Sequence, residues 1–203
     1  VSVPKSFLVS MYRNAMKLNK LISRIIDFRK LESGKLKLEP QSLNLVAFCK
    51  DLTVDYEALC QQKNIIFHFL PSRTVIRVEF DPEKMEILLS NLISNAFKYT
   101  PEGGKIVLSI DETDEKVTLV VEDNGIGIQK EFQEVIFDRF FQIENTEIFS
   151  TGDGIGLSFV KHLVELHDGT IRVESELNKG AKFIVELPKK ERVDEPVSSE
   201  EEI

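Results

Sequence analysis

The chain has 203 residues, of which 42% are hydrophobic and 30% are charged, so it can bury a core and is not disordered as a whole. Its formal net charge of -8 and pI of about 5.1 argue against a dedicated nucleic-acid binder, which would carry a basic patch. Its apolar runs, such as residues 119–121, are far shorter than the ~18 residues of a membrane-spanning helix. Because the chain starts at Val1 with neither an initiator Met nor a signal segment, we expect a piece of a longer protein.

The first predicted element is a bundle or coiled-coil helix over residues 7–31. Its apolar residues follow the a and d positions of a heptad: Leu8, Met11, Ala15, Leu18, Ile22 and Ile25. No other part of the chain repeats this pattern, so we expect the stripe to associate with a partner or to lie partly exposed. Ser33 and Gly34 end the helix.

The remainder predicts an α/β sandwich. We expect a short strand stopped by Pro40, a helix over residues 43–64, and strands over 65–70 and 75–80. A helix from Asp81, its N-cap, to Tyr99 comes next. Strands follow at 106–108 and 117–122, a helix at 154–166, and strands at 171–175 and 182–187.

The two cysteines and the acidic tail complete the predicted organisation. Cys49 and Cys60 lie on one predicted helix, roughly 16 Å apart, which is too far for a disulfide and fits reduced thiols in the cytoplasm. The tail lacks a core pattern, so a disordered linker is expected. We therefore divide the chain into residues 1–33, 34–188 and 189–203.

The first cluster with chemical potential lies on the helix that ends at Tyr99. Asn91, Asn95 and Lys98 fall within about 60° of one another on one stripe that flanks the apolar face. Two amides and an ammonium there suit a phosphate-bound Mg²⁺, which prefers a few protein oxygens together with phosphate and water. The alternative is an ordinary solvated helix edge.

The second cluster runs from Asp123 to Gly127. Strand alternation places Asp123 on the inward face, where its carboxylate needs hydrogen-bond donors. An adenine amine is a suitable donor, and Gly125 and Gly127 would let the backbone approach the base. The alternative is a glycine turn capped by an aspartate.

The third cluster, Gly152 to Leu157, opens the last predicted helix. Backbone amides at a helix N-terminus can bind phosphate. The cluster lacks the Lys-Ser/Thr ending of a P-loop and does not follow a strand, so alone it is weak support for binding. Before it, the long stretch over residues 128–151 carries Phe137, Phe140 and Phe141, which we expect to anchor an otherwise mobile loop.

In this order, the clusters resemble the N, first glycine, F and second glycine boxes of sensor histidine kinases, over about residues 81–187. Residues 27–32 resemble the second helix of the dimerisation and phosphotransfer hairpin in that family. The chain is also similar to hybrid sensor kinases, which carry receiver domains downstream.

The resemblance implies a Bergerat-type ATP-binding fold of the GHKL superfamily. This is an α+β sandwich in which helices cover one face of a mixed or antiparallel sheet, here preceded by one long bundle helix. It implies that Asp123 binds the adenine amine and that Asn95 ligates Mg²⁺. The remaining implied ATP-binding residues are Asn91, Lys98, Tyr99, Gly125, Gly127, Ile128, Gly152, Gly154, Gly156 and Leu157.

Three departures from the family pattern stand out. No histidine precedes His68, so the phosphoacceptor is missing, and we expect His68, His162 and His167 to be structural or at the surface. Gln142 stands where an arginine often reaches the γ-phosphate, which leaves Arg139 as the candidate catalytic substitute. Asp153 replaces a residue that is commonly small or hydroxylated, and its charge would repel phosphates.

The leading hypothesis is the catalytic domain of a histidine kinase that binds Mg-ATP and phosphorylates a histidine absent from this chain. One alternative is a regulatory module that binds nucleotide without productive transfer. Another is a topoisomerase, mismatch-repair or chaperone ATPase of the same superfamily. Expected partners are the histidine-bearing hairpin, a second copy through the N-terminal helix, and a response regulator or receiver domain, but no nucleic acid. The expected location is the cytoplasmic portion of a membrane-anchored sensor.

Overall fold

The computed structural model describes residues 36–142 and 154–189, together with residues 7, 8, 11, 12, 14, 15, 18 and 29. The chain divides into two compact units, Val1–Leu38 and Glu39–Ile203. In the first unit the described residues between positions 7 and 29 are helical and exposed, among them Leu8, Met11 and Leu18 of the predicted stripe. Ile22 and Ile25, most of residues 27–32, and the tail beyond Lys189 lie outside the described residues.

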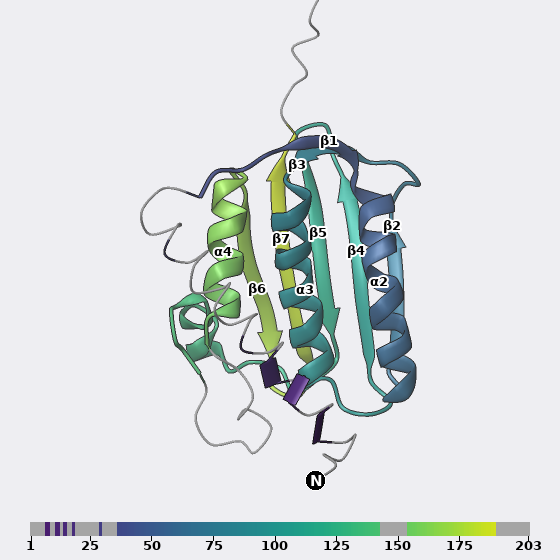
Figure 1. Cartoon of the computed structure of the whole chain (residues 1–203), viewed down its shortest axis with the longest axis vertical. Helices are drawn as coiled ribbons and strands as arrows, with labels where there is room; N and C mark the ends of the chain where they lie inside the picture. Colours follow the sequence, from purple (N-terminus) through teal and green to yellow (C-terminus); the bar gives the residue numbers. More distant parts are fainter. Residues whose placement is uncertain are drawn as a thin grey trace, which may run out of the picture. The chain divides into compact units, whose positions relative to one another are not determined.

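The second unit is built on a five-stranded sheet in the order β2-β4-β5-β7-β6 (Figure 1). Strand β2 (Ile66–Pro71) runs parallel to β4 (Lys105–Glu112). The other neighbours, which involve β5 (Lys116–Asp123), β7 (Gly180–Pro188) and β6 (Thr170–Glu176), pair antiparallel. The sheet is therefore mixed, as predicted. A separate pair joins β1 (Gln41–Asn44) antiparallel to β3 (Arg77–Phe80).

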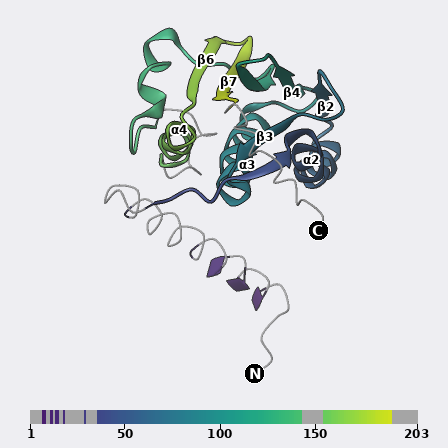
Figure 2. The ribbon, with the colours of Figure 1, turned by 90° about the horizontal axis from the view of Figure 1, so that it is seen from above.

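Three helices form one layer over one face of this sheet (Figures 1 and 2). They are α2 (Leu45–Gln62), α3 (Pro82–Tyr99) and α4 (Gly156–Leu166). Two short 3₁₀ helices, η1 (Lys130–Phe132) and η2 (Val135–Phe137), lie between β5 and α4 in the sequence. This arrangement confirms the predicted α+β sandwich with helices on one face.

The core lies between the sheet and the helices, and strict alternation along β5 shows which strand face lines it. Val117, Leu119 and Val121 are buried, whereas the intervening side chains are more exposed. Opposite them, α3 buries Leu88 and Leu92. Helix α3 therefore has one face fixed in the core, which sets the direction of its flanking polar stripe.

Helix α3 begins as the sequence predicts. Asp81 is the N-cap, and its Oδ1 accepts a hydrogen bond of 3.1 Å from the N–H of Lys84. Pro82 occupies the first turn, where its missing N–H costs nothing. The helix ends at Tyr99, and the N–H of Thr100 donates to the carbonyl of Ala96. These boundaries fix the ends of the helix that carries the first cluster.

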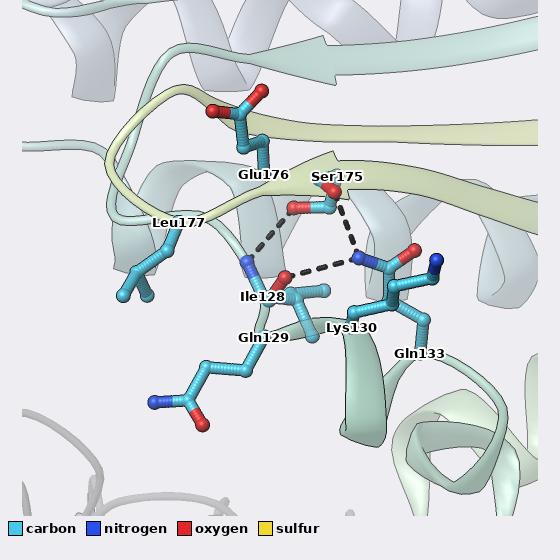
Figure 3. Close-up of a pocket in the computed structure, with 7 residues that line it drawn as sticks. All are labelled: Ile128, Gln129, Lys130, Gln133, Ser175, Glu176 and Leu177. Atoms are coloured by element: carbon cyan, nitrogen blue, oxygen red, sulfur yellow. Dashed lines mark hydrogen bonds between the residues drawn. The ribbon is translucent and has the colours of Figure 1, made fainter.

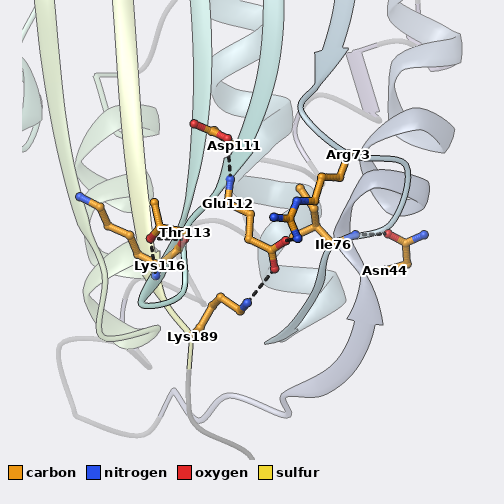
Figure 4. Close-up of polar contacts among 8 residues, drawn as sticks. All are labelled: Asn44, Arg73, Ile76, Asp111, Glu112, Thr113, Lys116 and Lys189. Carbon is orange, nitrogen blue, oxygen red and sulfur yellow. Dashed lines mark hydrogen bonds and ion pairs between the residues drawn. The ribbon is translucent and has the colours of Figure 1, made fainter.

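The predicted strand before Pro40 is wrong. Residues 36–40 form no regular structure, and the strand comes afterwards as β1, with Gln41 opposite Phe80. Asn44 then ends the strand and caps α2, because its Oδ1 accepts a 3.2 Å hydrogen bond from the N–H of Val46. The same oxygen also accepts from the N–H of Ile76 at 3.2 Å (Figure 4). The strand depends on pairing with distant β3, which local alternation cannot predict.

An ion cluster closes the sheet at the end away from Asp123. The side chain of Glu112, only 10% exposed, pairs with Lys189 at 2.7 Å and with Arg73 at 3.3 Å (Figure 4). The N–H of Lys189 also donates to the carbonyl of Glu115 at 2.8 Å. The cluster therefore holds the end of β7 against the β4–β5 hairpin.

Cys49 and Cys60 lie within α2 as free, buried thiols. Within the described part of the chain, no helix combines the length and the apolar character needed to cross a membrane.

Candidate functional site

The carboxylate of Asp123 ends β5 inside the protein, as the strand alternation predicts. Its residue is 7% exposed, and Oδ1 accepts a 2.8 Å hydrogen bond from the N–H of Gly125. Burial raises the pKa of Asp123 to about 6, while the N–H groups of Gly125 and Ala181 oppose the shift and the charge of Glu122 adds to it. The Asp123 carboxylate is thus a buried hydrogen-bond acceptor with a raised pKa, and a donor such as an amine could bind it.

Glycine is required in the loop after Asp123. A Cβ on Gly125 would lie 2.3 Å from the carbonyl oxygen of Tyr99 and 2.8 Å from Oδ1 of Asp123. Gly127 has φ +67, and a Cβ there would lie 2.0 Å from the carbonyl oxygen of Glu176. The loop therefore lies directly against the end of α3 and the end of β6. It brings together four of the predicted site residues, Tyr99, Asp123, Gly125 and Gly127.

Asn91 lies where α3 meets the beginning of α4. It is 7% exposed, and its Nδ2 donates a hydrogen bond of 2.7 Å to the carbonyl of Ile87. Its Oδ1 is 3.0 Å from the position that a Cβ on Gly156 would take. A side chain at residue 156 would press on this amide, so the second glycine cluster packs directly against the first cluster.

The other members of the polar stripe are half-buried, which confirms that the stripe flanks the core. Lys98 donates from Nζ to the hydroxyl of Tyr99 at 3.0 Å, with Nζ 4.7 Å from the centroid of the Tyr99 ring. The Asn95 amide forms no hydrogen bond among the residues that the structure describes. Its carbonyl oxygen can therefore take a cation without breaking an internal bond.

The start of α4 has the features of an anion site. Gly154 has φ +67, and its carbonyl accepts a 3.0 Å hydrogen bond from the N–H of Phe140. The N-cap residue Ile155 makes no side-chain capping bond, and Leu157 is half-buried. First-turn amides and the helix dipole favour negative charge at such a terminus. Gly152 and Asp153 lie outside the described residues.

The phenylalanines before this helix differ in their packing. Phe137 is buried and contacts Phe183 edge to face at 6.4 Å, and the rings of Phe132 and Phe141 lie 5.7 Å apart. Phe140 is 68% exposed with φ +61, so the expectation that it anchors the segment is wrong. The chain turns at this residue, and its ring points away from the core.

The remaining candidates are placed as follows. Arg139 and Gln142 are exposed, and the catalytic role of Arg139 stays a prediction. His68 is exposed on β2, and His162 pairs with Glu165 at 3.5 Å. His167 is buried and hydrogen-bonded at the end of α4. The three histidines lie in structural or surface settings.

Sequence reasoning missed two residues beside the first glycine loop, Gln133 and Ser175. They join the segment after Gly127 to the end of β6 through hydrogen bonds to Ile128 (Figure 3). No local pattern marks them, because their role depends on two segments more than 40 residues apart meeting in space.

Comparison with known proteins assigns the family. Residues 80–191, more than half of the chain, match the family described as "Histidine kinase-, DNA gyrase B-, and HSP90-like ATPase". The chain belongs to this family of ATP-binding domains. Its relatives and solved neighbours narrow the assignment to the ATP-binding catalytic domain of sensor histidine kinases.

Among curated relatives, Histidine kinase P4 of Formosa agariphila is 39% identical over 179 residues, which cover 86% of this chain. Hybrid signal transduction histidine kinase D of Dictyostelium discoideum is 34% identical over 189 residues, or 90% of this chain. The alignments span only 13% and 12% of these two relatives.

Among solved structures, the nucleotide-free catalytic domain of histidine kinase ThkA has a TM-score of 0.68 and 33% identity, covering 75% of this chain and 99% of that one. ThkA in complex with the response regulator TrrA has a TM-score of 0.70 and 26% identity, covering 94% and 53%. ShkA in complex with AMPPNP has a TM-score of 0.81, and its 22% identity, covering 94% and 40%, supports the fold alone.

Proposed function

We propose that this chain binds Mg-ATP and that the protein containing it transfers the γ-phosphoryl group to a histidine that is missing from this chain. The observation that carries the proposal is the buried Asp123 carboxylate beside a loop that only glycine fits. Such a group can accept a hydrogen bond from the amine of adenine. The family assignment supports this use of Asp123, because it is a family of ATP-binding domains.

The phosphate side of the proposed site is formed by α3 and α4. Lys98 would complement phosphate charge, and the first-turn amides of α4 would donate to phosphate oxygens. Asn91, whose amide lies directly against Gly156, would line the same side of the site. A positive helix terminus and an ammonium are the groups that phosphoryl transfer uses to stabilise negative charge.

The residues present also fit Mg²⁺. The Asn95 amide is half-buried and makes no internal hydrogen bond within the described residues, so its oxygen is available as a ligand. A bound Mg²⁺ would neutralise charge between phosphate groups. The chain's own contribution is to hold adenine at Asp123 and phosphates at α4, so that the γ-phosphoryl group faces the incoming histidine.

The proposal is tested by calorimetric titration of the chain with ATP, with and without Mg²⁺. We expect saturable binding that Asp123→Asn abolishes and that Asn95→Ala makes insensitive to Mg²⁺. Ser94→Ala, one position away and exposed, is the matched control and should bind as the parent does. Absence of binding in the parent chain would overturn the proposal.

The second step needs a separate experiment. A hairpin carrying histidine, acidic residue and proline, supplied in trans with γ-labelled ATP and Mg²⁺, should become labelled. Confirmed ATP binding without label transfer would favour the regulatory module instead. Gln142 and Asp153 motivate that alternative, because both depart from residues that meet phosphate in the family.

For assembly, we propose a homodimer through the N-terminal helix and a response regulator or receiver domain as the downstream partner. The exposed apolar residues Leu8, Met11 and Leu18 support the first part, and the ThkA complex with TrrA supports the second. Analytical ultracentrifugation should show a dimer that Leu8→Glu with Leu18→Glu dissociates. A monomeric parent chain would contradict the dimer.

Placement in the cytoplasmic portion of a membrane-anchored sensor remains part of this proposal, to be tested by fractionating cells that express the whole protein.

A further inference from the structure

Gln133 connects two segments that the sequence keeps far apart. Its Nε2 donates to the carbonyl of Ile128 at 3.1 Å and to the carbonyl of Ser175 at 2.7 Å (Figure 3). A primary amide has two N–H bonds, and both are used here. Gln133 lies just after η1, whereas Ser175 is close to the end of edge strand β6. One side chain thus fixes the segment after the first glycine loop to the sheet.

The hydroxyl of Ser175 completes the connection. Its Oγ accepts a 2.8 Å hydrogen bond from the N–H of Ile128 and donates at 2.6 Å to the carbonyl of Gly180 (Figure 3 shows the first). Both backbone polar groups of Ile128 are therefore bound, one by Ser175 and one by Gln133. We call Gln133 and Ser175 the clasp.

The clasp acts beside the proposed adenine site. The N–H of Asn178 donates to the carbonyl of Ile126 at 2.7 Å, so the β6–β7 hairpin holds the glycine loop directly. A Cβ on Gly180 would lie 1.8 Å from the carbonyl oxygen of Asp123, which shows how closely the hairpin approaches the end of β5. Any shift of Ile128 relative to this hairpin would move the loop that carries Gly125 and Gly127.

We propose that Gln133 and Ser175 are positioning residues for the adenine base, acting through Ile128 on the first glycine loop. The proposal rests on the proposed function, because it assumes that ATP binds at Asp123. Both side chains are half-buried, and neither needs to touch the nucleotide. Their contribution is to hold the loop in the binding geometry before the nucleotide arrives, which lowers the cost of binding.

The position of the clasp predicts which part of the nucleotide is affected. Its hydrogen bonds end on Ile128, Ser175 and Gly180, whereas the proposed phosphate contacts lie on α3 and α4. Loss of the hydrogen bonds made by the clasp should therefore weaken the binding of ATP and of ADP by the same factor. It should raise KM for ATP and leave kcat unchanged, as expected when ground-state and transition-state binding are lost equally.

The test is a set of matched variants of the whole chain, titrated calorimetrically with Mg-ADP and Mg-ATP. Gln133→Leu keeps the size of the side chain but loses both donors, and Ser175→Ala loses the hydroxyl. Each should raise Kd about fivefold or more for both nucleotides. Gln129→Leu is the control, because Gln129 is exposed and lines the same pocket as Gln133 and Ser175 (Figure 3), but its side chain makes no hydrogen bond among the described residues.

Two further readouts separate positioning from general stability. Ser175→Thr retains the hydroxyl and should restore the affinity that Ser175→Ala loses. Amide hydrogen exchange should accelerate at Ile128 and Asn178 in Ser175→Ala, while exchange in α2 stays unchanged. Ser175→Ala also serves if Gln133→Leu does not fold.

The outcomes distinguish this inference from the proposed function. If the parent chain binds no nucleotide, the proposed function fails. If it binds and both Gln133→Leu and Ser175→Ala bind equally well, the clasp does not position the base. Weaker binding of ATP alone, with the Kd for ADP unchanged, would place the effect at the phosphates and would also overturn the inference.

Discussion

The backbone N–H of Asp81 donates a 3.2 Å hydrogen bond to Nε2 of His167, 86 residues further along the chain. The other ring nitrogen, Nδ1, lies 2.7 Å from the carbonyl oxygen of Leu163. Since a carbonyl only accepts, Nδ1 carries the proton and Nε2 accepts, which is one neutral tautomer of imidazole. The bond joins the beginning of α3 to the end of α4, the two helices whose opposite ends carry the proposed phosphate contacts.

Replacement of His167 by leucine should destabilise the catalytic unit. The buried N–H of Asp81 would lose its partner, at a cost of about 1–3 kcal/mol, whereas the carbonyl of Leu163 would keep the hydrogen bond from the backbone N–H of residue 167. Urea denaturation should show the loss. His162→Leu, on the same helix but paired only with a half-exposed Glu165, is the control and should change stability by less than about 0.5 kcal/mol. Equal stability of the two variants would show that the buried bond contributes nothing.

Asp81 should stabilise the fold in its ionised form. Burial opposes ionisation, but the N–H groups of Glu39 and Lys84 and the charge of Lys84 together lower the pKa of Asp81 below its usual 3.8. A carboxyl with a lowered pKa in the folded state stabilises above the unfolded pKa, and this contribution disappears as pH falls through the folded value. Asp81→Asn should therefore be less stable than the parent at pH 7, and the gap should narrow below about pH 4.

Thermal unfolding at pH 7, 5 and 3 measures this dependence. Glu83→Gln, in the first turn of the same helix but highly exposed, is the control and should show little difference at any of these pH values. A gap between Asp81→Asn and the parent that stays constant from pH 7 to pH 3 would contradict the role of the charge.

The sequence predicts the elements whose signals are local. Helix α3 has an N-cap aspartate, a proline in its first turn and a continuous apolar face, so its boundaries follow from residues within it. The inward position of Asp123 follows from alternation along β5. The ordered boxes then identify the site, because each glycine cluster is a short contiguous motif.

The features that the sequence does not predict depend on contacts between distant segments. Strand β1 exists because Gln41 meets Phe80, and it lies after Pro40 rather than before it. Similarly, the clasp requires Gln133 to reach Ser175, and neither residue has a neighbour in sequence that indicates the partner. Such pairings add no periodicity, so they emerge only from the folded arrangement.

Glu112 should stabilise the end of the sheet farthest from Asp123 through its ion pairs with Arg73 and Lys189. Its side chain is largely buried between Arg73 and Lys189, so Glu112→Gln should lower stability by about 1–2 kcal/mol at low salt. The loss should shrink in 1 M salt, where screening reduces the value of the ion pairs. Asp114→Asn, exposed in the adjacent turn, is the control. Salt-independent destabilisation would point to packing instead of charge.

The raised pKa of Asp123 gives a second, independent test of the site. In the chain without nucleotide, the ¹³C signal of its carboxyl should titrate near pH 6, because burial disfavours the charge. Saturating Mg-ADP should move this midpoint to lower pH, because a hydrogen bond from the adenine amine stabilises the ionised form. A midpoint near 4 without nucleotide would contradict the burial argument, and a midpoint that nucleotide leaves unchanged would contradict the adenine contact.

The same shift predicts that Asp123 reduces stability at neutral pH. A folded-state pKa raised from 3.8 to about 6 means that the folded chain holds the proton more tightly than the unfolded chain. Stability from the protonated group is complete below the unfolded pKa and is lost as pH rises through 6, by up to about 3 kcal/mol.

Asp123→Asn removes this penalty, since its amide oxygen can still accept from the N–H of Gly125. It should therefore unfold at a higher temperature than the parent at pH 7.5 and at a similar temperature at pH 3.5, while Glu122→Gln, exposed on the same strand, should change little at either pH. A variant that is less stable than the parent at pH 7.5 would show that the ionised carboxylate supports the fold and is not strained by its burial.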